Sequence, residues 1–386
     1  MEMLRTRKSG TLNQERLFMA SKRFSFLGWL SVFLLLALVF AGAVPARAQQ
    51  QVPQSTTSPI PILAYYYIWY NTSSWNRAKI DYPLLGKYSS DAISVMRQQI
   101  LWAKAAGING FIVSWKSTDV LNSRLEQLVQ VAEQENFKLA VIYEGLDFNR
   151  NPLPVQTVAN DLDYFIQHFA GQSAFDVFSK PMLIWSGTWK FTPQEVAQVT
   201  QGRRSSLLIL ASERNVAGYQ QLAGSVDGDA YYWSSVNPNT YPAYKDKLSQ
   251  MGQAVHQNGG IWIPPAAPGF DATAIGGTTT VARNNGATFR TQINTAMFSS
   301  PDVLGIISWN EFSENSYIEP SQNYGFTYLN ILSGINHLPL VSVAQFDSSE
   351  PAATFPDLLP YSRVIALGGF SILVLAGLVI VVVRRH

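Results

Sequence analysis

The stretch GFIVSWKSTDVLNSRLEQLVQVAEQENFKLAVIYE, residues 110–144, contains a complete strand-helix-strand unit. It opens with the apolar run Gly110 to Trp115 and closes with a second apolar run, Leu139 to Glu144. Between them, Ser123 to Asn136 carries apolar residues at the three- and four-residue spacing of an amphipathic helix. Continuous apolar strands on either side of one helix predict a parallel sheet that is covered by helices.

The same alternation continues in both directions from this unit. Eight runs are expected as strands: Ile62 to Tyr67, Gly110 to Trp115, Leu139 to Glu144, Met182 to Trp185, Ser206 to Leu210, Asp229 to Trp233, Gly260 to Pro264 and Val303 to Trp309. Expected helices include Asp91 to Ala106, Ser123 to Asn136, Val155 to Phe169, Thr192 to Val199, Tyr241 to Gln257 and Val281 to Met297. Eight such units in about 280 residues predict an α/β fold, a (β/α)8 TIM barrel over residues 60–338. An open doubly wound sheet is the alternative, but it favours a glycine-rich phosphate loop after the first strand, and the sequence has none there.

The N-terminal segment has the features of a secretory signal. Residues 24–46 carry no charge, follow a cluster of basic residues and are followed by Ala46-Arg47-Ala48. This order predicts a signal peptide over residues 1–48, with cleavage after Ala48. An uncleaved anchor helix is the alternative, because the apolar run is long enough to span a bilayer. Residues 49–59, rich in Gln, Ser, Thr and Pro, are expected to be a linker.

The C-terminal segment has the features of a membrane anchor. Residues 364–383 carry no charge and are followed by the basic tail 384–386, which predicts a transmembrane helix with a cytoplasmic tail. A buried core helix is the alternative. The proline-containing segment 339–363 is expected to be a stalk, so that the barrel is tethered outside the cell membrane. The chain has no cysteine and therefore folds without disulfides, which favours a bacterial source.

Composition excludes several partners and kinds of chemistry. The chain has 28 basic and 26 acidic residues, a formal charge of +2, which gives no electrostatic footprint for nucleic acid. No His, Asp and Glu group has metal-ligand spacing, so neither a metal nor a cofactor is expected. The four histidines lie on or near expected helices or at the terminus, which leaves a Ser-His-Asp arrangement with little support. We expect a monomer.

The C-terminal ends of the expected strands are rich in aromatic rings and carboxylates. In a (β/α)8 barrel the active site is built at this edge. Rings that stack on sugar faces, with carboxylates among them, predict a glycan cleft. The residues expected to bind the substrate are Trp69, Tyr70, Trp115, Glu144, Tyr232, Trp233, Asp271, Asn310 and Glu319. Alternation along the first strand means that some of its rings must instead pack in the barrel or its wall.

The segment ISWNEFSENSYIEPS, residues 307–321, places three carboxylates after the last expected strand. Because that strand ends near Trp309, we expect Glu311 and Glu314 at the catalytic edge. Two carboxyl groups in one short loop near aromatic rings can hold different protonation states, one as acid and one as base. Glu311 and Glu314 are therefore the expected catalytic residues, with solvated loop charges as the alternative.

This segment resembles the Asn-Glu-aromatic-x-Glu…Ile-Glu-Pro signature of glycoside hydrolase family 99, the endo-α-mannosidases and endo-α-mannanases. Four other segments match that family in the same order: AYYYIWYN at 64–71, LGKYSSDAISVMRQQILWAKAAGINGFIVSW at 85–115, LAVIYEG at 139–145 and PPAAPGFD at 264–271. The loop is also similar to the Asn-Asp-aromatic-x-Glu-Ser loop of the family 71 α-1,3-glucanases. Ser313 and Asn315 stand where the mannosidases usually carry histidine and glycine, which puts the substrate specificity in question.

The family 99 resemblance implies roles for particular residues. Glu311 looks like the general base and Glu314 like the general acid/base. Glu144, Tyr66 and Tyr232 look like sugar-contacting positions. The implied reaction is endo cleavage of α-mannosides, in which Glu311 deprotonates the substrate's own 2-hydroxyl, a 1,2-anhydro sugar forms, and water then opens it. The family 71 likeness implies instead an inverting α-glucanase in which Glu311 activates water.

Two other functions stay open from the sequence. A barrel that has lost catalysis would serve as a carbohydrate-binding module, because a fold does not guarantee an activity. A protein of envelope glycan assembly would need a nucleotide-sugar donor and a phosphate-binding loop, and no such loop is found. Both carboxylates are present, which favours an enzyme that acts on an α-linked oligo- or polysaccharide.

Overall fold

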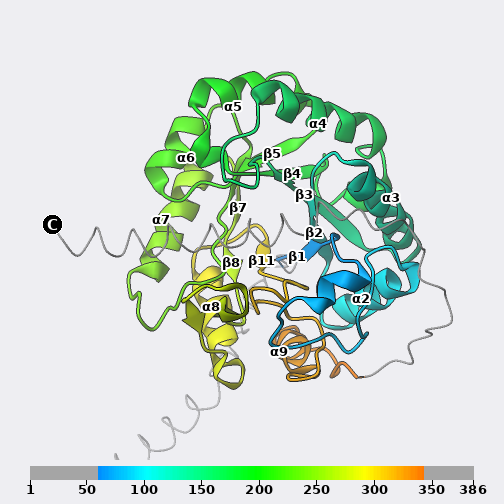
Figure 1. Ribbon diagram of the computed structural model, residues 1–386. Helices are drawn as coiled ribbons and strands as arrows, with labels where there is room; N and C mark the ends of the chain where they lie inside the picture. Colours follow the sequence, from blue (N-terminus) through cyan, green and yellow to red (C-terminus); the bar gives the residue numbers. More distant parts are fainter. Residues whose placement is uncertain (1–59, 343–386) are drawn as a thin grey trace, which may run out of the picture. The chain divides into compact units, whose positions relative to one another are not determined.

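The strands form a nearly closed parallel barrel surrounded by helices (Figure 1). The structure is a computed structural model, which describes residues 60–342. The strands of the main sheet are β1 Ile62–Tyr67, β2 Gly110–Trp115, β3 Lys138–Glu144, β4 Met182–Ser186, β5 Leu208–Ala211, β6 Gly228–Ala230, β7 Ile261–Ile263, β8 Pro265–Ala266 and β11 Leu304–Ile306. Their order is β7-β6-β5-β4-β3-β2-β1-β11-β8. A small antiparallel pair, β9 Phe270–Asp271 and β10 Thr280–Val281, lies outside this sheet.

The two edge strands β7 and β8 are separated by a single residue, Pro264. β7 pairs with β6 through Ile263 and Ala230, and β8 pairs with β11 through Ala266 and Ile306. The run from β7 to β8 therefore contacts both ends of the strand order. Proline has no N–H to donate to a ladder, so the strand is interrupted at this residue. The interrupted strand takes the seventh of eight positions, which is consistent with the (β/α)8 barrel expected from the sequence.

The helices follow the strands in alternation. They are α2 Ile93–Ala105, α3 Asp119–Gln134, α4 Val155–His168, α5 Pro193–Thr200, α6 Val216–Leu222, α7 Tyr244–Gln257, α8 Ala287–Phe298 and α9 Thr327–Ile335. Local signals explain where some begin. At α5, the Glu195 N–H donates to Thr192 Oγ1 at 3.2 Å and the Thr192 N–H donates to the Glu195 carboxylate at 2.7 Å, with Pro193 at the first helical position. The helices α6 and α9 are not among those expected from the sequence.

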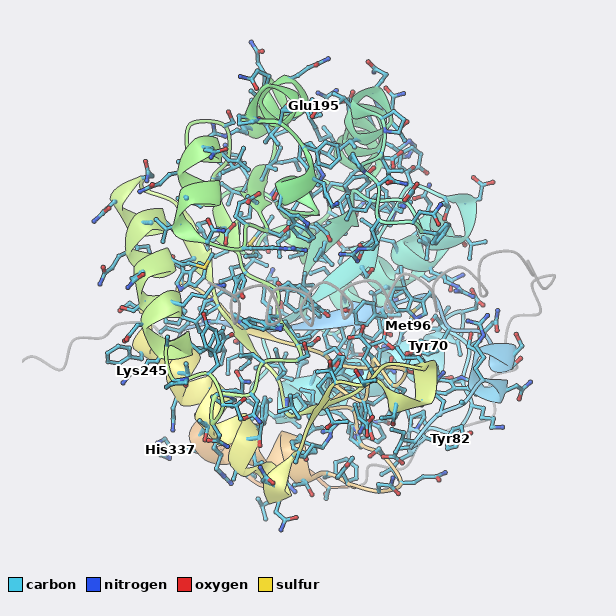
Figure 2. The ribbon with its side chains drawn as sticks, turned by 60° about the vertical axis from the view of Figure 1, so that its left-hand side comes forward. Tyr70, Tyr82, Met96, Glu195, Lys245 and His337 are labelled. Atoms are coloured by element: carbon cyan, nitrogen blue, oxygen red, sulfur yellow. The ribbon has the colours of Figure 1, made fainter. Side chains whose placement is uncertain are left out.

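The core has two layers that alternate along each strand. On β1, Leu63 and Tyr65 point into the barrel with residues of the other strands, whereas Ala64 and Tyr66 point toward the helices. Figure 2 draws the side chains of the described residues, among them the exposed Lys245 and the buried Tyr70.

Two rings that were expected to bind substrate belong to the helix-facing layer. Tyr66 stacks on Phe111 at 4.5 Å, and Trp115 donates its indole N–H to Asn122 of α3 at 2.9 Å. Trp115 is 0% exposed and Tyr66 is 1% exposed. The period of two along a strand turns both rings away from the barrel mouth, so the fold lends no support to their expected contact with substrate.

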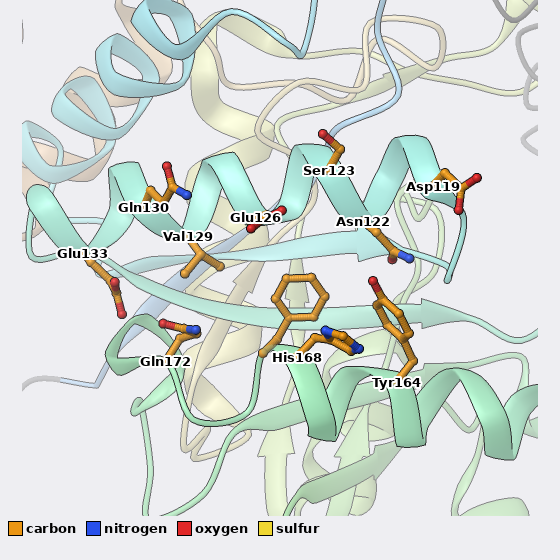
Figure 3. Close-up of a pocket in the computed structure, with 11 residues that line it drawn as sticks. Asp119, Asn122, Ser123, Glu126, Val129, Gln130, Glu133, Tyr164, His168 and Gln172 are labelled. Atoms are coloured by element: carbon orange, nitrogen blue, oxygen red, sulfur yellow. The ribbon is translucent and has the colours of Figure 1, made fainter.

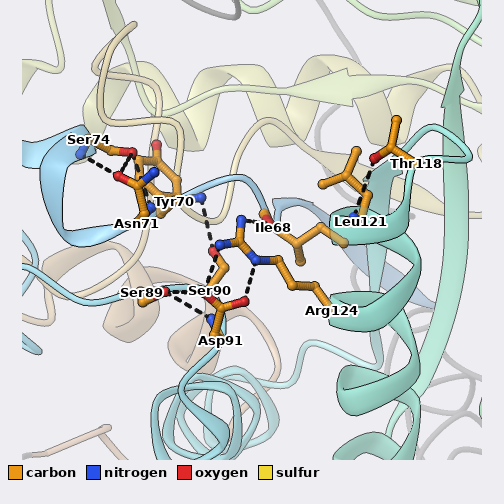
Figure 4. A network of polar contacts seen from close by, with 10 residues as sticks. All are labelled: Ile68, Tyr70, Asn71, Ser74, Ser89, Ser90, Asp91, Thr118, Leu121 and Arg124. Atoms are coloured by element: carbon orange, nitrogen blue, oxygen red, sulfur yellow. Dashed lines mark hydrogen bonds and ion pairs between the residues drawn. The ribbon is translucent and has the colours of Figure 1, made fainter. Parts of the chain in front are cut away.

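A buried ion pair joins three elements near the start of the barrel (Figure 4). Arg124 of α3 donates from Nε and Nη2 to the two oxygens of Asp91, at 2.6 and 2.7 Å. Its Nη1 donates to the carbonyl of Ile68, just after β1, at 2.9 Å. Asp91, which precedes α2, also accepts a hydrogen bond from Ser89 at 2.6 Å. This cluster fixes the loop between β1 and α2 against α3.

The observed β11 is shorter than the expected strand, Val303 to Trp309. The Ser308 N–H donates to the carbonyl of Ser316 at 2.8 Å, and the Ile318 N–H donates to the carbonyl of Ser308 at 2.9 Å. The chain thus folds back on itself after Ile306 and encloses a loop that carries Glu311 and Glu314. The expected strand Asp229 to Trp233 is likewise shorter, because β6 ends at Ala230.

Within residues 60–342, the structure has no helix long and apolar enough to cross a bilayer. The expected signal segment 1–48, the transmembrane helix 364–383 and its tail 384–386 all lie outside the described residues. The linker 49–59 and all but the first residues of the stalk also lie outside them.

Candidate active site

Asn310 links the loop after β11 to the end of β1 through hydrogen bonds. Its Oδ1 accepts the Tyr67 N–H at 2.8 Å and its Nδ2 donates to the Tyr67 carbonyl at 2.9 Å. The Asn310 carbonyl accepts the Tyr70 hydroxyl at 2.7 Å, and the Asn310 residue is 0% exposed. Asn310 was expected to bind substrate, but its amide is already committed to backbone partners. It is therefore a positioning residue of the candidate site.

Glu319 lies in a buried polar network behind the loop. Its two oxygens accept hydrogen bonds from Gln99 Nε2 at 2.7 Å and from the Tyr88 hydroxyl at 2.9 Å. Gln99 in turn accepts the hydroxyl of Tyr66 at 2.6 Å. Burial raises the pKa of Glu319 to about 8. Glu319 and Tyr66 thus hold the loop through hydrogen bonds within the protein, and their expected contact with substrate stays a prediction. No local sequence pattern distinguishes such a buried carboxyl from an exposed one.

Glu311 is buried but has polar partners that favour its ionised form. Its N–H donates to Ser308 Oγ at 2.8 Å, and its Oε1 accepts the Ser313 N–H at 2.9 Å. Burial raises the pKa of Glu311, while the Ser313 N–H and the Lys79 ammonium oppose that rise. Ser313, one of the positions that departs from the mannosidase pattern, therefore supports Glu311 through its backbone.

Glu314 has a different environment. Burial first, and then the charge of Glu311, raise the pKa of Glu314 to about 8, while Ser234 and Arg150 oppose the rise. The Ser234 hydroxyl donates to Glu314 Oε2 at 3.4 Å, and the Glu314 carbonyl accepts the Asp271 N–H at 2.8 Å. Glu314 therefore holds a proton near neutral pH. A neutral carboxyl beside an ionisable one is the arrangement that general acid/base catalysis needs.

Tyrosines form one wall of the site. The hydroxyls of Tyr67 and Tyr232 are 2.7 Å apart, and the Tyr65 ring meets the Tyr232 ring edge-on at 5.1 Å. Burial, followed by the facing Tyr232, raises the pKa of Tyr67, and burial followed by the charge of Glu314 raises the pKa of Tyr232. Both phenols therefore stay neutral and can donate hydrogen bonds. Tyr67 was missed from the sequence, although the alternation of AYYYIWYN puts it on the face opposite Tyr66.

The other expected residues fall into two groups. Trp69 and Glu144 are half-buried at strand ends; Trp69 packs on Tyr67 at 4.3 Å and Glu144 accepts the Ser114 hydroxyl at 3.0 Å. They lie where a ligand in the barrel mouth would reach them. By contrast, Tyr70 is 1% exposed and stacks on Trp75 at 4.7 Å, so it packs the wall.

Trp233 and Asp271 have structural partners of their own. The half-buried Trp233 lies in a ring cluster with Tyr231, Tyr241 and Tyr244 and donates its indole N–H to Ser235 at 3.1 Å. The Asp271 carboxylate accepts the N–H and the hydroxyl of Thr273, at 2.9 and 2.6 Å. Its own N–H holds the Glu314 backbone, so Asp271 positions the acid.

A buried guanidinium supports the same loop. Arg283 Nη2 donates to the carbonyls of Asn315 and Tyr317, each at 2.9 Å. Its guanidinium lies 4.4 to 4.6 Å from three tyrosine rings, those of Tyr317, Tyr324 and Tyr328. Four residues that act on this loop or on the carboxyl pair come from loops distant in sequence: Lys79, Arg150, Ser234 and Arg283. A single polar residue in a long loop has no sequence pattern that would predict such a role.

A separate groove of about 420 Å³ lies between α3 and α4 on the outside of the barrel (Figure 3). Tyr164 and His168 stack at 4.1 Å along one side of it, and Glu126 lines the other. None of the residues that line it belongs to the carboxyl pair or the tyrosine wall. The catalytic candidates therefore lie elsewhere, at the barrel mouth.

A parallel barrel with an acid/base carboxyl pair and neutral phenols at its strand ends has the groups that glycoside cleavage requires. A profile of glycosyl hydrolase family 99 matches residues 70–339, and the chain belongs to this family. This confirms the resemblance seen in the sequence motifs.

Several proteins that are similar to this chain in sequence or in structure are named as endo-α-mannosidases. The chain is 25% identical over 276 residues to a glycoprotein endo-alpha-1,2-mannosidase of Rattus norvegicus, covering 64% of this chain and 59% of the relative. It is 24% identical over 268 residues to a glycoprotein endo-alpha-1,2-mannosidase-like protein of Danio rerio, covering 62% and 58%. The chain thus spans less than two thirds of the length of these two relatives. A solved GH99 endo-alpha-mannosidase from Bacteroides thetaiotaomicron is 22% identical, with a TM-score of 0.62 over 72% of this chain and 96% of that one, which shows the shared fold.

Proposed function

We propose that the protein is a glycoside hydrolase that cleaves internal α-mannosidic bonds. The observation that carries this proposal is the carboxyl pair, in which burial and mutual charge keep the pKa of Glu314 near 8 while the Ser313 N–H and Lys79 favour ionised Glu311. Membership of family 99 and the mannosidase names of its relatives support the same activity. No cofactor takes part in the proposed reaction.

The first step of the proposed mechanism cleaves the glycosidic bond. Glu311 accepts the proton of the substrate's 2-hydroxyl as the 2-oxygen bonds to the anomeric carbon. The bond from that carbon to the leaving oxygen breaks, and Glu314 gives its proton to that oxygen. The product of this step is a 1,2-anhydro sugar, with Glu311 neutral and Glu314 ionised.

The second step reverses the proton transfers. Glu314 takes a proton from water as the water oxygen bonds to the anomeric carbon. The bond between that carbon and the 2-oxygen breaks, and the 2-oxygen recovers its proton from Glu311. Two inversions give net retention of the α configuration. Tyr67 and Tyr232, held neutral by burial, are placed to donate hydrogen bonds at the sugar.

The test is to incubate the purified protein with a panel of α-mannans and α-glucans and to follow the products by chromatography and proton NMR. Release of mannan oligosaccharides whose first-formed reducing end is the α-anomer is the expected result. Cleavage of an α-glucan with a β-anomeric product would replace the proposal with an inverting glucanase. Binding of the glycans without any cleavage would replace it with a carbohydrate-binding function.

We also propose that the enzyme acts outside the cell, tethered by the uncharged segment 364–383. Support comes from the sequence: the segment carries no charge and is followed by Arg384 and Arg385. Truncation before Arg363 should release active protein into the outer fluid. Continued membrane association of the truncated protein would contradict the assignment.

A further inference from the structure

Three consecutive loops at the catalytic edge carry a group of residues that the proposed mechanism does not use. Arg150 follows β3, Trp189 follows β4 and Arg214 follows β5. The Arg214 guanidinium lies 4.1 Å from the centre of the Trp189 ring, and stacking of this kind fixes the plane of the guanidinium. All three residues are half-buried. They therefore line the side of the barrel mouth next to Glu144.

Neither guanidinium has a hydrogen bond or an ion pair with any residue in the described range 60–342. The Nε atom of Arg150 is shielded from water and has no acceptor. By contrast, Arg124 and Arg203 each bind a carboxylate through two nitrogens. Shielded polar groups are rarely left without partners in folded proteins, because the loss of solvation is not offset. The missing acceptors therefore point to a ligand.

The backbone also presents Arg150 in an unusual way. Arg150 has φ of +66°, in the left-handed region that glycine and asparagine adopt most easily. The turn around it is firmly held: the Arg150 N–H donates to the Asp147 carbonyl at 3.0 Å and the Leu153 N–H donates to the Gly145 carbonyl at 3.0 Å. Backbone strain of this kind concentrates at binding sites.

The two arginines face three carboxyl groups, and Arg214 also faces Arg150. Arg150 faces Glu144 and Glu314, and Arg214 faces Glu213 and Arg150. Glu314 holds its proton near neutral pH, and burial raises the pKa of Glu213 as well. The Lys116 ammonium donates to the carbonyl of Leu146 at 3.0 Å, beneath the Arg150 loop, and faces the carboxyl groups of Glu144, Asp147 and Asp161. Two guanidiniums that repel one another are stabilised by an anion between them.

We infer that Arg150 and Arg214 form a subsite for an anionic substituent, a phosphate or a carboxylate, on the glycan that the enzyme cleaves. Guanidinium groups bind both oxyanions through paired N–H donors. The inference rests on the proposed function, since it names a property of the substrate of that reaction. Because the Arg150 charge lowers the pKa of Glu314, the two side chains are close, and the anion lies next to the proton donor.

The experiment compares substrates that differ only in charge. α-Mannan that carries phosphate monoesters is compared with the same mannan after phosphatase treatment, and an α-mannan that carries uronic acid side groups gives a second arm. The variants are Arg150→Gln and Arg214→Gln. Arg290→Gln, on the exposed face of α8, is the matched control.

The wild type should cleave at least one anionic mannan about tenfold more efficiently, in kcat/KM, than its neutral counterpart. Each variant should lose about tenfold on that mannan, because a charge-assisted hydrogen bond contributes about a factor of ten or more. Arg214→Gln should lose less than threefold on the neutral mannan, whereas Arg150→Gln need only lose less on the neutral mannan than on the charged one, because Arg150 also lowers the pKa of Glu314. Which anionic mannan shows the effect tells phosphate from carboxylate. Equal losses on charged and neutral mannan, or none on either, would overturn the inference and leave the proposed function intact.

Affinity electrophoresis in gels containing each mannan separates failure of the subsite from failure of the proposed activity. Stronger retention of the wild type by a charged mannan, lost in Arg150→Gln and Arg214→Gln but kept in Arg290→Gln, supports the anion subsite even where no glycan is cleaved. Equal retention of all four proteins by charged and neutral gels overturns it.

Discussion

Glu311 and Glu314 are three residues apart, and burial raises the pKa of both, but different groups oppose that rise at each. Lys79 and the Ser313 N–H face Glu311 and oppose the rise in its pKa that burial causes. Glu314 faces the charge of Glu311 and has only Ser234 and Arg150 to oppose it. The difference comes from loops that meet at the barrel mouth and not from the loop sequence alone. It supports the roles proposed for Glu311 as the base and Glu314 as the acid.

The substitution Glu314→Gln should remove proton donation to the leaving oxygen. We expect a loss of about 10² to 10⁴ in kcat/KM on natural glycans, the usual range for general acid/base help. Aryl mannosides with nitrophenol leaving groups need little protonation and should lose far less in the bond-cleaving step. Steady-state and pre-steady-state kinetics on both substrates measure the contrast. An equal loss on the two substrates would remove Glu314 from the acid role.

The dependence of kcat/KM on pH should have two limbs, one set by the titration of Glu314 and the other by that of Glu311. Activity should fall as the pH rises past about 8, because Glu314 then loses its proton, and should fall at low pH as Glu311 becomes protonated. The groups that face Glu311 are Lys79, Ser313 and Glu314, together with the phenols of Tyr67, Tyr70 and Tyr232.

Replacing Lys79 should move the acidic limb. Without the ammonium the pKa of Glu311 rises further, so in Lys79→Met the acidic limb of kcat/KM should move up by about one pH unit. Lys87→Met, in the same loop but exposed and without an effect on Glu311, is the control. An acidic limb at the same pH in both variants would show that Lys79 does not tune the base.

The Arg124–Asp91 pair carries the geometry of the loop between β1 and α2. Both side chains are less than 9% exposed, so removal of one partner leaves a buried charge uncompensated. We expect Arg124→Ala to lower the free energy of unfolding by about 3 to 5 kcal/mol. The double variant Arg124→Ala, Asp91→Ala should lose less than the sum of the two single variants. Denaturant unfolding of all four proteins measures the coupling, and simple additivity would show that the two residues act independently.

The elements of the barrel were largely predictable because their signals are local. The strand over residues 62–67 and the strand over 110–115 are found at the bounds expected, since apolar runs buried on both faces stand out from their surroundings. The helices α6 and α9 were not named from the sequence, because they are short, with seven and nine residues, and so carry few repeats of the helical period. The strand was expected to continue to Trp309, but β11 ends earlier because the Ser308 N–H binds the Ser316 carbonyl. The apolar sequence of the strand does not predict this contact.

The candidate site was predictable only in part, for a physical reason. Glu311 and Glu314 follow a strand directly, so topology alone places them at the catalytic edge. Three residues that were expected to bind substrate have partners within the protein. Strand alternation turns Tyr66 and Trp115 toward the helices, and Asn310 is hydrogen-bonded to the backbone of Tyr67. Lys79 and Arg150 depend on the path of long loops, which residue patterns do not determine.

The molecule as a whole joins the first strand to the last loop to make the site. Tyr67 and Asn310 are 243 positions apart in sequence and exchange two hydrogen bonds. The loop after β1 meets the loop after β11 again where Asp81 accepts the hydroxyl of Tyr317 at 2.5 Å and where Tyr88 reaches Glu319. The near-closure of the barrel therefore brings Glu311, Glu314 and the tyrosine wall together, as the proposed reaction requires.

That geometry makes a stereochemical demand on the substrate. In an α-mannoside the 2-oxygen and the leaving group are both axial on opposite faces of the ring, so the 2-hydroxyl can attack from behind the breaking bond. In an α-glucoside the 2-hydroxyl is equatorial and cis to the leaving group, so this attack is closed. If Glu311 is the base for the 2-hydroxyl, mannosides that are 2-deoxy or 2-O-methylated should bind without being cleaved, and the α-mannan product should retain its configuration. Proton NMR of the first-formed anomer and turnover assays on the 2-modified substrates measure both. Cleavage of a 2-deoxy mannoside, or an inverted product, would show that Glu311 activates water instead, because neither outcome is open to an enzyme whose nucleophile is the substrate's own 2-oxygen.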